Sequence, residues 1–352
     1  MITFFPGPSR VYPQVATFMQ EAFEQGLLSI SHRSETFNQM SEKTIGLVKS
    51  KLNVPADYTV FYTSSATENW EIIAQSLTTQ QSTHFYSGAF GEKWHEYARK
   101  IHSQAEGFRF DTNDHADVAS WQVAPESEVI CITQNETSNG TQIPAASIEK
   151  LRELHPEKLI AVDVTSSLAG IALPFAAADI WYGSVQKCFG LPAGLGLLIC
   201  SPRAIERAQS IGERGHYNSF LVMLDNIKKW QTSCTPNVLG IYLLMRVLET
   251  MPHISEIDAQ TKARACAYYE AVQAAQNLSL LVENEAVRSD TVVAVKGTKE
   301  QVAAWKTQAK QAGILLGAGY GSWKETSFRI ANFPALQPAE VAALLDLLPK
   351  LS

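Results

Sequence analysis

Lys187 is the residue whose position most strongly indicates chemistry. It is the only charged residue between Asp179 and Arg203, and it comes directly after the apolar run DIWYGSV. Burial at the end of such a strand disfavours the ammonium form, which lowers the pKa of a lysine and makes its amine a nucleophile toward carbonyl groups. The same pattern also fits a lysine whose stem packs on the core while its ammonium reaches water.

Asp163 is a second polar residue near the end of an apolar run, LIAVDVT, which precedes the run before Lys187. Ligands of open α/β sheets bind at the carboxyl ends of the strands, so the two side chains are predicted to face one crevice. An aspartate at such a place also commonly caps the next segment. A pyridoxal phosphate site needs this pair, because an amine forms the imine and an acid keeps the pyridine nitrogen protonated.

The loop after the first apolar run offers a place for a phosphate. Ser65 and Glu68 have the spacing of a capping box, in which a helix begins directly after the strand. The N–H groups and hydroxyls at a helix start bind anions, although most capping boxes bind nothing. The loop has no G-x-G-x-x-G motif, which argues against a nicotinamide enzyme.

These residues lie in a chain whose pattern predicts an α/β fold. Six short apolar runs alternate with segments of helical spacing, which indicates a doubly wound sheet buried on both faces. Long helices and strand-like runs follow, typical of a smaller α+β lobe that the first dozen residues are expected to join. The predicted main strands are 58–63, 83–88, 128–133, 159–165, 179–185 and 195–201, with helices at 68–79, 90–104, 146–154, 237–250, 256–276, 299–312 and 338–348, and later strands at 291–296 and 327–331.

Length and composition narrow the class of protein. The 352 residues exceed the roughly 250–300 that one hydrophobic core reaches, so two lobes are predicted. Only 18% of the residues are charged and 45% are hydrophobic, which excludes disorder and indicates a large core, a subunit interface, or both. The net charge of -6 argues against nucleic acid or membrane partners and favours small molecules.

The cysteines and the N-terminal residues indicate the cellular compartment in which the protein is expected to work. The five cysteines lie far apart without zinc spacing, so no metal site is predicted and reduced thiols in the cytoplasm fit best. The first residues, MITFFPGPSR, contain prolines and an arginine where an export signal needs an apolar core. The weakly charged region 164–202 is interrupted by charges, prolines and glycines, which indicates a core segment and not a membrane span.

Eight motifs in order along the chain resemble those of the class V, fold-type I pyridoxal-phosphate aminotransferases, and most closely the phosphoserine aminotransferases among them. The resemblance covers nearly the whole chain, and its strength lies in the order and spacing of the motifs. They are FFPGPSR (4–10), ISHRSETF (30–37), SGAFGEKW (87–94), NETSNGT (135–141), VDVTSS (162–167), SVQKCFG (184–190), TPN (235–237) and SFRIANF (327–333).

The resemblance implies an architecture. It implies a large pyridoxal-phosphate domain over residues 15–252, with a doubly wound, mainly parallel, seven-stranded sheet. Residues 1–14 and 253–352 would form the small α+β domain. It further implies a homodimer with shared active sites that takes small amino-acid and 2-oxo-acid substrates.

The resemblance also implies roles for individual residues. Lys187 would form the Schiff base with pyridoxal 5'-phosphate and Asp163 would pair with the pyridine nitrogen. Thr137 would lie near the phenolic oxygen, and Phe90 would stack on the ring where many relatives have tryptophan. The other implied phosphate or pocket contacts are Ser65, Ala66, Thr67, Ser166, Gln186 and, from the neighbouring subunit, Thr235.

On the substrate side, Arg329 matches the arginine that binds the α-carboxylate. His32 and Arg33 resemble a pair that reaches the substrate phosphate across the dimer interface. Two positions depart from the pattern, because Thr67 stands where an arginine usually binds that phosphate and Cys234 stands where asparagine is common. The missing arginine weakens the match to phosphoserine and leaves transamination untouched.

Three functions remain open from the sequence. The first is transamination between phosphoserine and 2-oxoglutarate, as in serine biosynthesis, and the second is the same chemistry on alanine or serine with glyoxylate or pyruvate. Cysteine desulfurases share the fold but have histidine before the lysine, where this chain has Gln186. The third function is a non-enzymatic binding protein, which would be colourless when purified.

Overall fold

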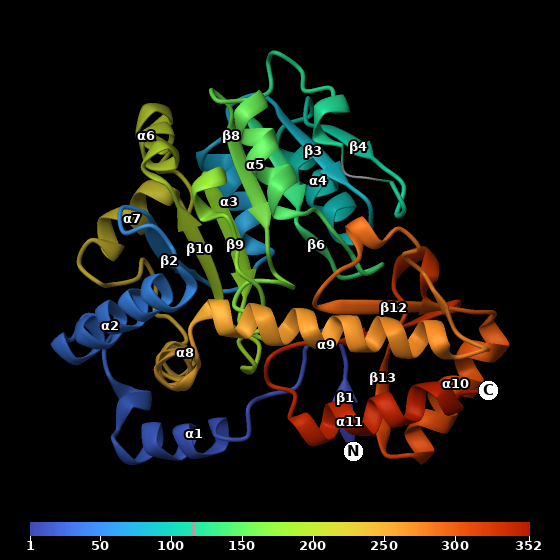
Figure 1. Cartoon of the computed structure of the whole chain (residues 1–352). Coiled ribbons are helices and arrows are strands. Elements are labelled where there is room, and N and C mark those ends of the chain that lie inside the picture. The colour runs from blue at the N-terminus through green and yellow to red at the C-terminus, as the bar shows by residue number, and fades with distance from the viewer. Residues whose placement is uncertain (115–116) are drawn as a thin grey trace.

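The computed structural model describes residues 1–114 and 117–352 (Figure 1). Within these residues, a seven-stranded sheet has the order β2-β10-β9-β8-β5-β3-β4 and a five-stranded sheet has the order β1-β13-β14-β12-β11. A two-stranded hairpin, β6 (Asn135–Glu136) and β7 (Thr141–Gln142), lies between them in sequence. The predicted division into a large and a small sheet is confirmed.

The seven-stranded sheet is mainly parallel, because β10 alone in its described strands runs antiparallel to its neighbours. All six predicted strands are confirmed to within about two residues. The seventh, β4, was not predicted, because its residues are exposed or half-buried and form no apolar run. The strands are β2 (Thr59–Thr63), β3 (Ser82–Tyr86), β4 (Glu106–Arg109), β5 (Val129–Thr133), β8 (Leu159–Asp163), β9 (Ile180–Ser184) and β10 (Gly196–Cys200).

Helices cover both faces of this sheet, as a doubly wound fold requires; in Figure 1, α5 lies in front of it and α3 and α4 lie behind. The predicted helices correspond to α3, α4, α5 and α8, whereas α1, α2, α6 and α7 were not predicted. The helices are α1 (Val15–Glu24), α2 (Glu35–Leu52), α3 (Glu68–Ser76), α4 (Ala89–Ile101), α5 (Ala145–Leu154), α6 (Pro202–Ile211), α7 (Phe220–Ile227) and α8 (Val238–Thr250).

The five-stranded sheet joins the two ends of the chain, because β1 pairs in parallel with β13. A second hydrophobic cluster combines Phe4 with residues between 268 and 351. The domain limits at 14/15 and 252/253 stay predictions. The elements are β1 (Ile2–Phe4), β11 (Ser279–Leu280), β12 (Val292–Lys296), β13 (Ile314–Ala318) and β14 (Ser327–Ala331), with α9 (Ile254–Ala274), α10 (Lys299–Gln311) and α11 (Pro338–Leu347).

Among the described helices, none is long and apolar enough to cross a membrane. In the same residues, no group of three or more His, Cys, Asp or Glu side chains is placed to hold a metal ion. The five cysteines are free, and Cys131, Cys188 and Cys200 are buried.

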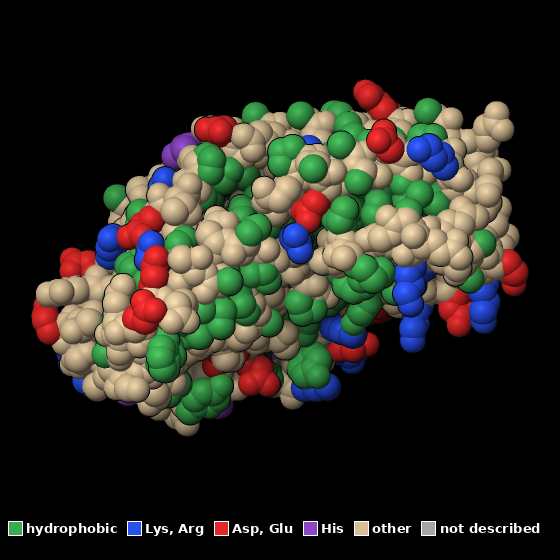
Figure 2. Space-filling view, turned by 90° about the horizontal axis from the view of Figure 1, so that it is seen from below, with side chains coloured by type: hydrophobic (Ala, Val, Ile, Leu, Met, Phe, Trp, Pro, Cys, Tyr) green, Lys and Arg blue, Asp and Glu red, His purple; other side chains and the backbone are tan. Residues whose placement is uncertain are grey.

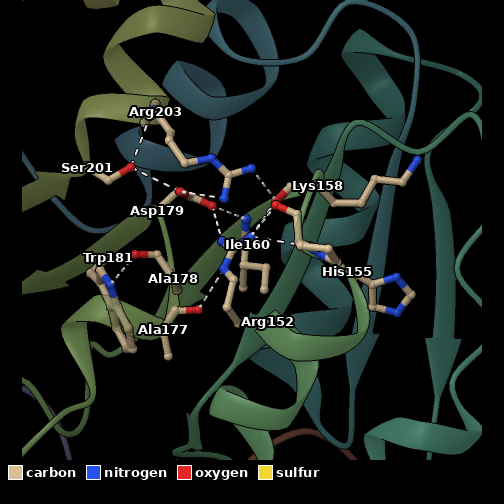
Figure 3. A network of polar contacts seen from close by, with 12 residues as sticks. Arg152, His155, Lys158, Ile160, Ala177, Ala178, Asp179, Trp181, Ser201 and Arg203 are labelled. Carbon is tan, nitrogen blue, oxygen red and sulfur yellow. Dashed lines mark hydrogen bonds and ion pairs between the residues drawn. The ribbon is translucent and has the colours of Figure 1, made fainter.

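A buried polar network holds the amino end of β9, away from the end that carries Lys187 (Figure 3). The Asp179 carboxylate is 3% exposed and accepts hydrogen bonds from the Arg152 guanidinium, from the Ile160 N–H at 3.0 Å and from the Ser201 hydroxyl at 3.0 Å. Arg203 lies 3.7 Å from the same carboxylate. One buried anion thus ties together three strands and two helices.

Replacing Asp179 with alanine is expected to lower the free energy of unfolding by about 3–5 kcal/mol, because the half-buried Arg152 guanidinium loses its counter-ion and the buried Ile160 N–H loses its acceptor. Urea denaturation measures the change. Asp225→Ala is the matched control, because its carboxylate pairs with Arg214 at 2.8 Å on the surface and should contribute about 1 kcal/mol or less. Equal losses in both variants would contradict this account.

Candidate active site

A cavity of about 260 Å³ lies at the carboxyl ends of β2, β5, β8 and β9, and the N-terminal segment and β14 complete its wall. The predicted residues that line it are Ser65, Ala66, Thr67, Phe90, Thr137, Asp163, Gln186, Lys187 and Arg329. The lining residues that were not predicted are Pro6, Gly7, Pro8, Trp70, Thr133, Asn135, Thr165, Ser184 and Tyr320. The sheet therefore brings most of the predicted site together.

The Lys187 amine is buried inside this cavity. The side chain is 7% exposed, and Nζ donates hydrogen bonds to Thr137 Oγ1 at 2.9 Å and to Ser166 Oγ at 2.8 Å. Burial lowers the pKa of Lys187 to about 8, against the opposing charge of Asp163. A large fraction of the amine is therefore neutral near pH 8 and able to attack a carbonyl carbon.

The Asp163 carboxylate is also buried, at 5% exposed. Its Oδ1 accepts a hydrogen bond from the Thr165 N–H at 2.8 Å within a turn, so it caps no helix. Burial raises the pKa of Asp163, whereas Thr165, Lys187 and the Tyr182 hydroxyl act in the opposite direction. Trp70 Nε1 donates to that hydroxyl at 2.9 Å, which holds it beside the carboxylate.

The loop after β2 differs in detail from the predicted capping box. The Ser65 hydroxyl accepts from the Glu68 N–H at 3.2 Å as predicted, but the Glu68 carboxylate returns to the Ser64 N–H at 2.7 Å and not to Ser65. The shift occurs because helical turns begin early, at Ala66, whose carbonyl accepts from the Asn69 N–H. The loop still leaves small side chains and a hydroxyl on the cavity wall.

Arg329 reaches the cavity from β14 of the five-stranded sheet. Its Nη1 donates to the Thr137 carbonyl at 2.7 Å and its Nε to the Ala318 carbonyl at 2.7 Å. The side chain is 7% exposed, and burial lowers its pKa to about 10, against the charge of Glu136. No carboxylate forms an ion pair with Arg329 in the described residues, so its charge is available to an anion.

Two stacked rings form one wall. Phe90 and Tyr320 lie 4.9 Å apart between centroids at an interplanar angle of 21°, and Lys187 Nζ lies 5.5 Å from the Phe90 centroid. Phe90 therefore lies on the cavity wall, and its stacking on a cofactor ring stays a prediction. Tyr320 was missed, although its setting in the GYG tripeptide marks a turn.

Glu136 was also missed, and it fixes the start of α4. The buried carboxylate accepts hydrogen bonds from the Phe90 N–H at 3.1 Å, the Gly91 N–H at 3.2 Å and the Ser138 N–H at 2.9 Å. A carboxylate at a helix N-terminus accepts hydrogen bonds from the free N–H groups and is stabilised by the positive end of the helix dipole. Glu136 thus holds Phe90 in place from the neighbouring hairpin.

The N-terminal segment packs against Lys187. Gly7 has φ +148, and a Cβ there would lie 3.0 Å from Lys187 Cε. Ser9 donates through its N–H to the Gln186 carbonyl at 3.0 Å, which ties the segment to the loop that carries the lysine. Glycine is required at position 7 because a side chain would crowd Lys187 and would disfavour the positive φ.

Other predicted residues do not line this cavity. Ser166 is not among the residues that line the cavity, but its hydroxyl accepts a hydrogen bond from Lys187 Nζ. Arg33 donates to Asn226 Oδ1 at 2.8 Å and to Gln231 Oε1 at 2.7 Å in the same chain. His32 lies beside Arg33, and its pKa is lowered chiefly by partial burial. Thr235 and Cys234 line a separate cavity of about 300 Å³ behind the β2 loop.

Cys188, next to the lysine, is unsuited to act as a nucleophile. Its thiol donates to the Ser166 carbonyl at 3.3 Å, and burial raises its pKa to about 12. The thiolate is therefore scarce at neutral pH. This distinguishes the site from one that depends on a reactive cysteine.

The cavity fits pyridoxal phosphate on its own geometry. It combines a neutralisable lysine amine, a buried carboxylate and an aromatic face, and the Thr133 and Thr165 hydroxyls are buried there without partners in the described part of the chain. Together with a mainly parallel sheet whose strand ends carry these groups, this defines a fold-type I pyridoxal-phosphate enzyme. More narrowly, the chain belongs to the class-V aminotransferase family, which matches residues 3–330.

Known proteins that are similar to the chain support its assignment to this family. A phosphoserine aminotransferase of Rhodococcus opacus is 27% identical over 350 residues, which cover 96% of this chain and 91% of the relative. The crystal structure of a phosphoserine aminotransferase from Cytophaga hutchinsonii is 34% identical, with a TM-score of 0.95 over 99% of this chain and 98% of that one. An aspartate aminotransferase from Thermus thermophilus, 22% identical with a TM-score of 0.85 over 100% and 99% of the two chains, shares the fold. The protein is thus a pyridoxal-phosphate-dependent transaminase.

Proposed function

We propose that this transaminase moves an amino group between phosphoserine and 2-oxoglutarate in the cytoplasm. The observation that carries the proposal is one cavity in which the Lys187 amine, the Asp163 carboxylate and the Arg329 guanidinium face the same space. The similar proteins named phosphoserine aminotransferases supply the substrate. The free cysteines fit a reducing compartment.

The residues of the cavity divide the work of transamination. Pyridoxal phosphate, when bound, supplies an aldehyde and a ring that accepts electrons. Lys187 would hold it covalently, and the freed lysine amine would carry the proton from the substrate Cα to the cofactor's C4′. Thr137 and Ser166 hold the lysine amine in place, and Asp163 keeps the ring nitrogen protonated. The residues proposed to hold the cofactor phosphate and pocket are Ser65, Ala66, Thr67, Gln186 and Thr235, with Phe90 against the ring.

The substrate carboxylate is assigned to Arg329, whose guanidinium offers two parallel donors to two carboxylate oxygens. Its anchorage on the carbonyls of Thr137 and Ala318 fixes the direction of that fork. Because Thr137 also contacts Lys187, the α-carbon of a bound amino acid is held within reach of the lysine amine. This arrangement suits any amino acid and does not select the side chain.

The protein is proposed to act as a homodimer in which His32, Arg33 and Thr235 serve the partner's cavity. Figure 2 shows apolar side chains across the middle of this face, whereas most charged groups lie toward its left end and its edges. On and after α1, Met19 and Phe23 are exposed by 42% and 69% and Leu28 by 46%. Exposed apolar groups of this size favour burial in an interface.

Mixing two impaired variants tests the shared site. A Lys187→Ala chain and an Arg33→Ala chain are each expected to turn over phosphoserine poorly, whereas a mixed dimer holds one cavity with both residues intact. Random exchange should restore about a quarter of the unmodified activity. Each variant taken alone through the same exchange is the control. No recovery after verified exchange would place the action of Arg33 in its own subunit.

A second candidate is transamination of alanine or serine with glyoxylate or pyruvate. Thr67 favours it, because a neutral hydroxyl stands where phosphoserine aminotransferases usually have an arginine. The bonds from Arg33 to Asn226 and Gln231 also favour it, because a bound phosphate would have to displace them. Amino acids without a phosphate need neither cation.

Steady-state rates decide between the two. We expect Arg33→Ala to reduce kcat/KM for phosphoserine by about 10- to 100-fold, because a charge-assisted hydrogen bond contributes about 1.5–3 kcal/mol, and to leave the alanine rate within about threefold. Thr67→Arg should widen the preference for phosphoserine over serine. Arg214→Ala, an exposed arginine, is the control. If the unmodified protein prefers alanine or serine, the phosphoserine assignment is wrong and the second candidate replaces it.

A further inference from the structure

A second hollow opens beside the catalytic cavity, and we name it the Lys306–Lys310 groove. It has a volume of about 600 Å³ and shares Pro6, Gly7 and Arg329 with the catalytic cavity. Its remaining walls come from α10, from β13 and from the residue that follows β1. The groove therefore leads from the surface of the five-stranded lobe to the guanidinium that is assigned to the substrate carboxylate.

The charges that face the groove have one sign. Lys306 and Lys310 are one helical turn apart on α10, the first half-buried and the second exposed. Neither lysine forms an ion pair within the described residues, and no acidic side chain is among those that line the groove. With Arg329 at its inner end, the groove carries three cations and attracts anions along its length.

The floor between these charges is apolar. Ile314 and Leu316 of β13 point into the second hydrophobic cluster, so Leu315 points to the opposite face and lines the groove, half-buried. Phe5, 40% exposed, lies beside it. Apolar walls lower the local dielectric constant and strengthen the attraction of the cations for a ligand.

We propose that the Lys306–Lys310 groove is an outer subsite for short acids that carry two anionic groups, either two carboxylates or a carboxylate and a phosphate. The methylene groups of such an acid lie on Leu315 and Phe5, and its charges meet the lysines and Arg329. The inference rests on the proposed transamination of dianionic acids. It differs from the role assigned to Arg33, because every group comes from the same subunit.

Binding of an unreactive dianion to the holoenzyme tests the subsite. Glutarate has neither an amino nor a keto group, and butyrate is its singly charged counterpart. In Lys306→Gln/Lys310→Gln, the Kd of glutarate by calorimetry should rise about five- to tenfold at low ionic strength and by less than about twofold in about 0.5 M salt, where charges are screened. The Kd of butyrate should change by less than about twofold.

The control is Lys100→Gln/Lys150→Gln, which removes the same charge from exposed lysines on α4 and α5. It should leave glutarate binding unchanged. If both double variants bind glutarate equally weakly, the loss of affinity comes from net charge alone. If the Lys306→Gln/Lys310→Gln variant loses affinity for glutarate and butyrate equally, the loss comes from a change in structure. Either outcome overturns the proposal. Glutarate contains no phosphate, so failure of phosphoserine as a substrate would refute the donor assignment and leave this result standing.

Discussion

Lys187→Ala is expected to lower the rate of transamination by at least about a thousandfold, because one amine both holds the cofactor and moves the proton at the substrate α-carbon. The reason is structural as well as chemical. The Lys187 amine is held by Thr137 and Ser166 in a buried position, and no other lysine of the described residues lines the cavity. Steady-state assays with a saturating amino donor measure the loss.

Two measurements separate this role from a structural one. Borohydride reduction of the unmodified holoenzyme followed by peptide mapping should place the pyridoxyl group on Lys187. In cofactor-free protein, the rate of covalent cofactor uptake should rise as the pH increases through about 8, because the neutral amine is the reactive form. Thermal unfolding checks that Lys187→Ala still folds. A pyridoxyl group on another lysine would refute the assignment.

Asp163→Asn is expected to slow turnover by about a thousandfold, equivalent to about 4 kcal/mol in the barrier, because an amide does not hold the ring nitrogen in its protonated form. The substitution keeps the shape of the side chain and its acceptor for the Thr165 N–H. The variant should therefore still bind pyridoxal phosphate, as followed by its absorbance.

Asp163→Glu gives the matched comparison, because it keeps the charge but moves it within a tightly packed pocket. Partial activity in this variant with little in Asp163→Asn would show that the charge matters more than the hydrogen bond. Near-normal turnover by Asp163→Asn would show that another group protonates the ring nitrogen.

The sheet and the central pair of residues were predictable because their signals are local. Lys187 and Asp163 each interrupt an apolar run at its end, and adjacent parallel strands bring such ends together without further information. The register pairs Asp163 with Tyr182 on β9, the strand that leads to the lysine. Here the pattern of a few neighbouring residues determines the geometry.

Among the strands that were not predicted, β4 and β13 were missed for opposite reasons. Strand β4 is too exposed to show an apolar run, because it lies at the edge of the sheet. Strand β13 is apolar, but it follows α10 so closely that its run resembles the end of the helix. Length and periodicity alone do not separate these cases.

The cavity wall was less predictable because it depends on contacts between distant segments. Glu136 holds a helix that begins at Ala89, and Tyr320 meets Phe90 across the two lobes. Gly7 touches Lys187 from the other end of the chain. No periodic pattern in one segment reports such a contact, and the role proposed for Arg33 would require a second copy of the chain.

The pairing of β1 with β13 has a consequence for biosynthesis. Residues 2–4 are synthesised before the seven-stranded sheet, yet their partners, residues 314–316, are synthesised after the whole of that sheet. The seven-stranded sheet is complete in sequence by Cys200 and is free to fold during translation, as domains generally do. Ser9 can bond to the loop that carries the lysine as soon as that loop is made, but the residues before Pro6 have no strand to pair with until β13 emerges. In the nascent chain, the wall of the cavity next to β1 therefore stays unanchored by its sheet until β13 has emerged.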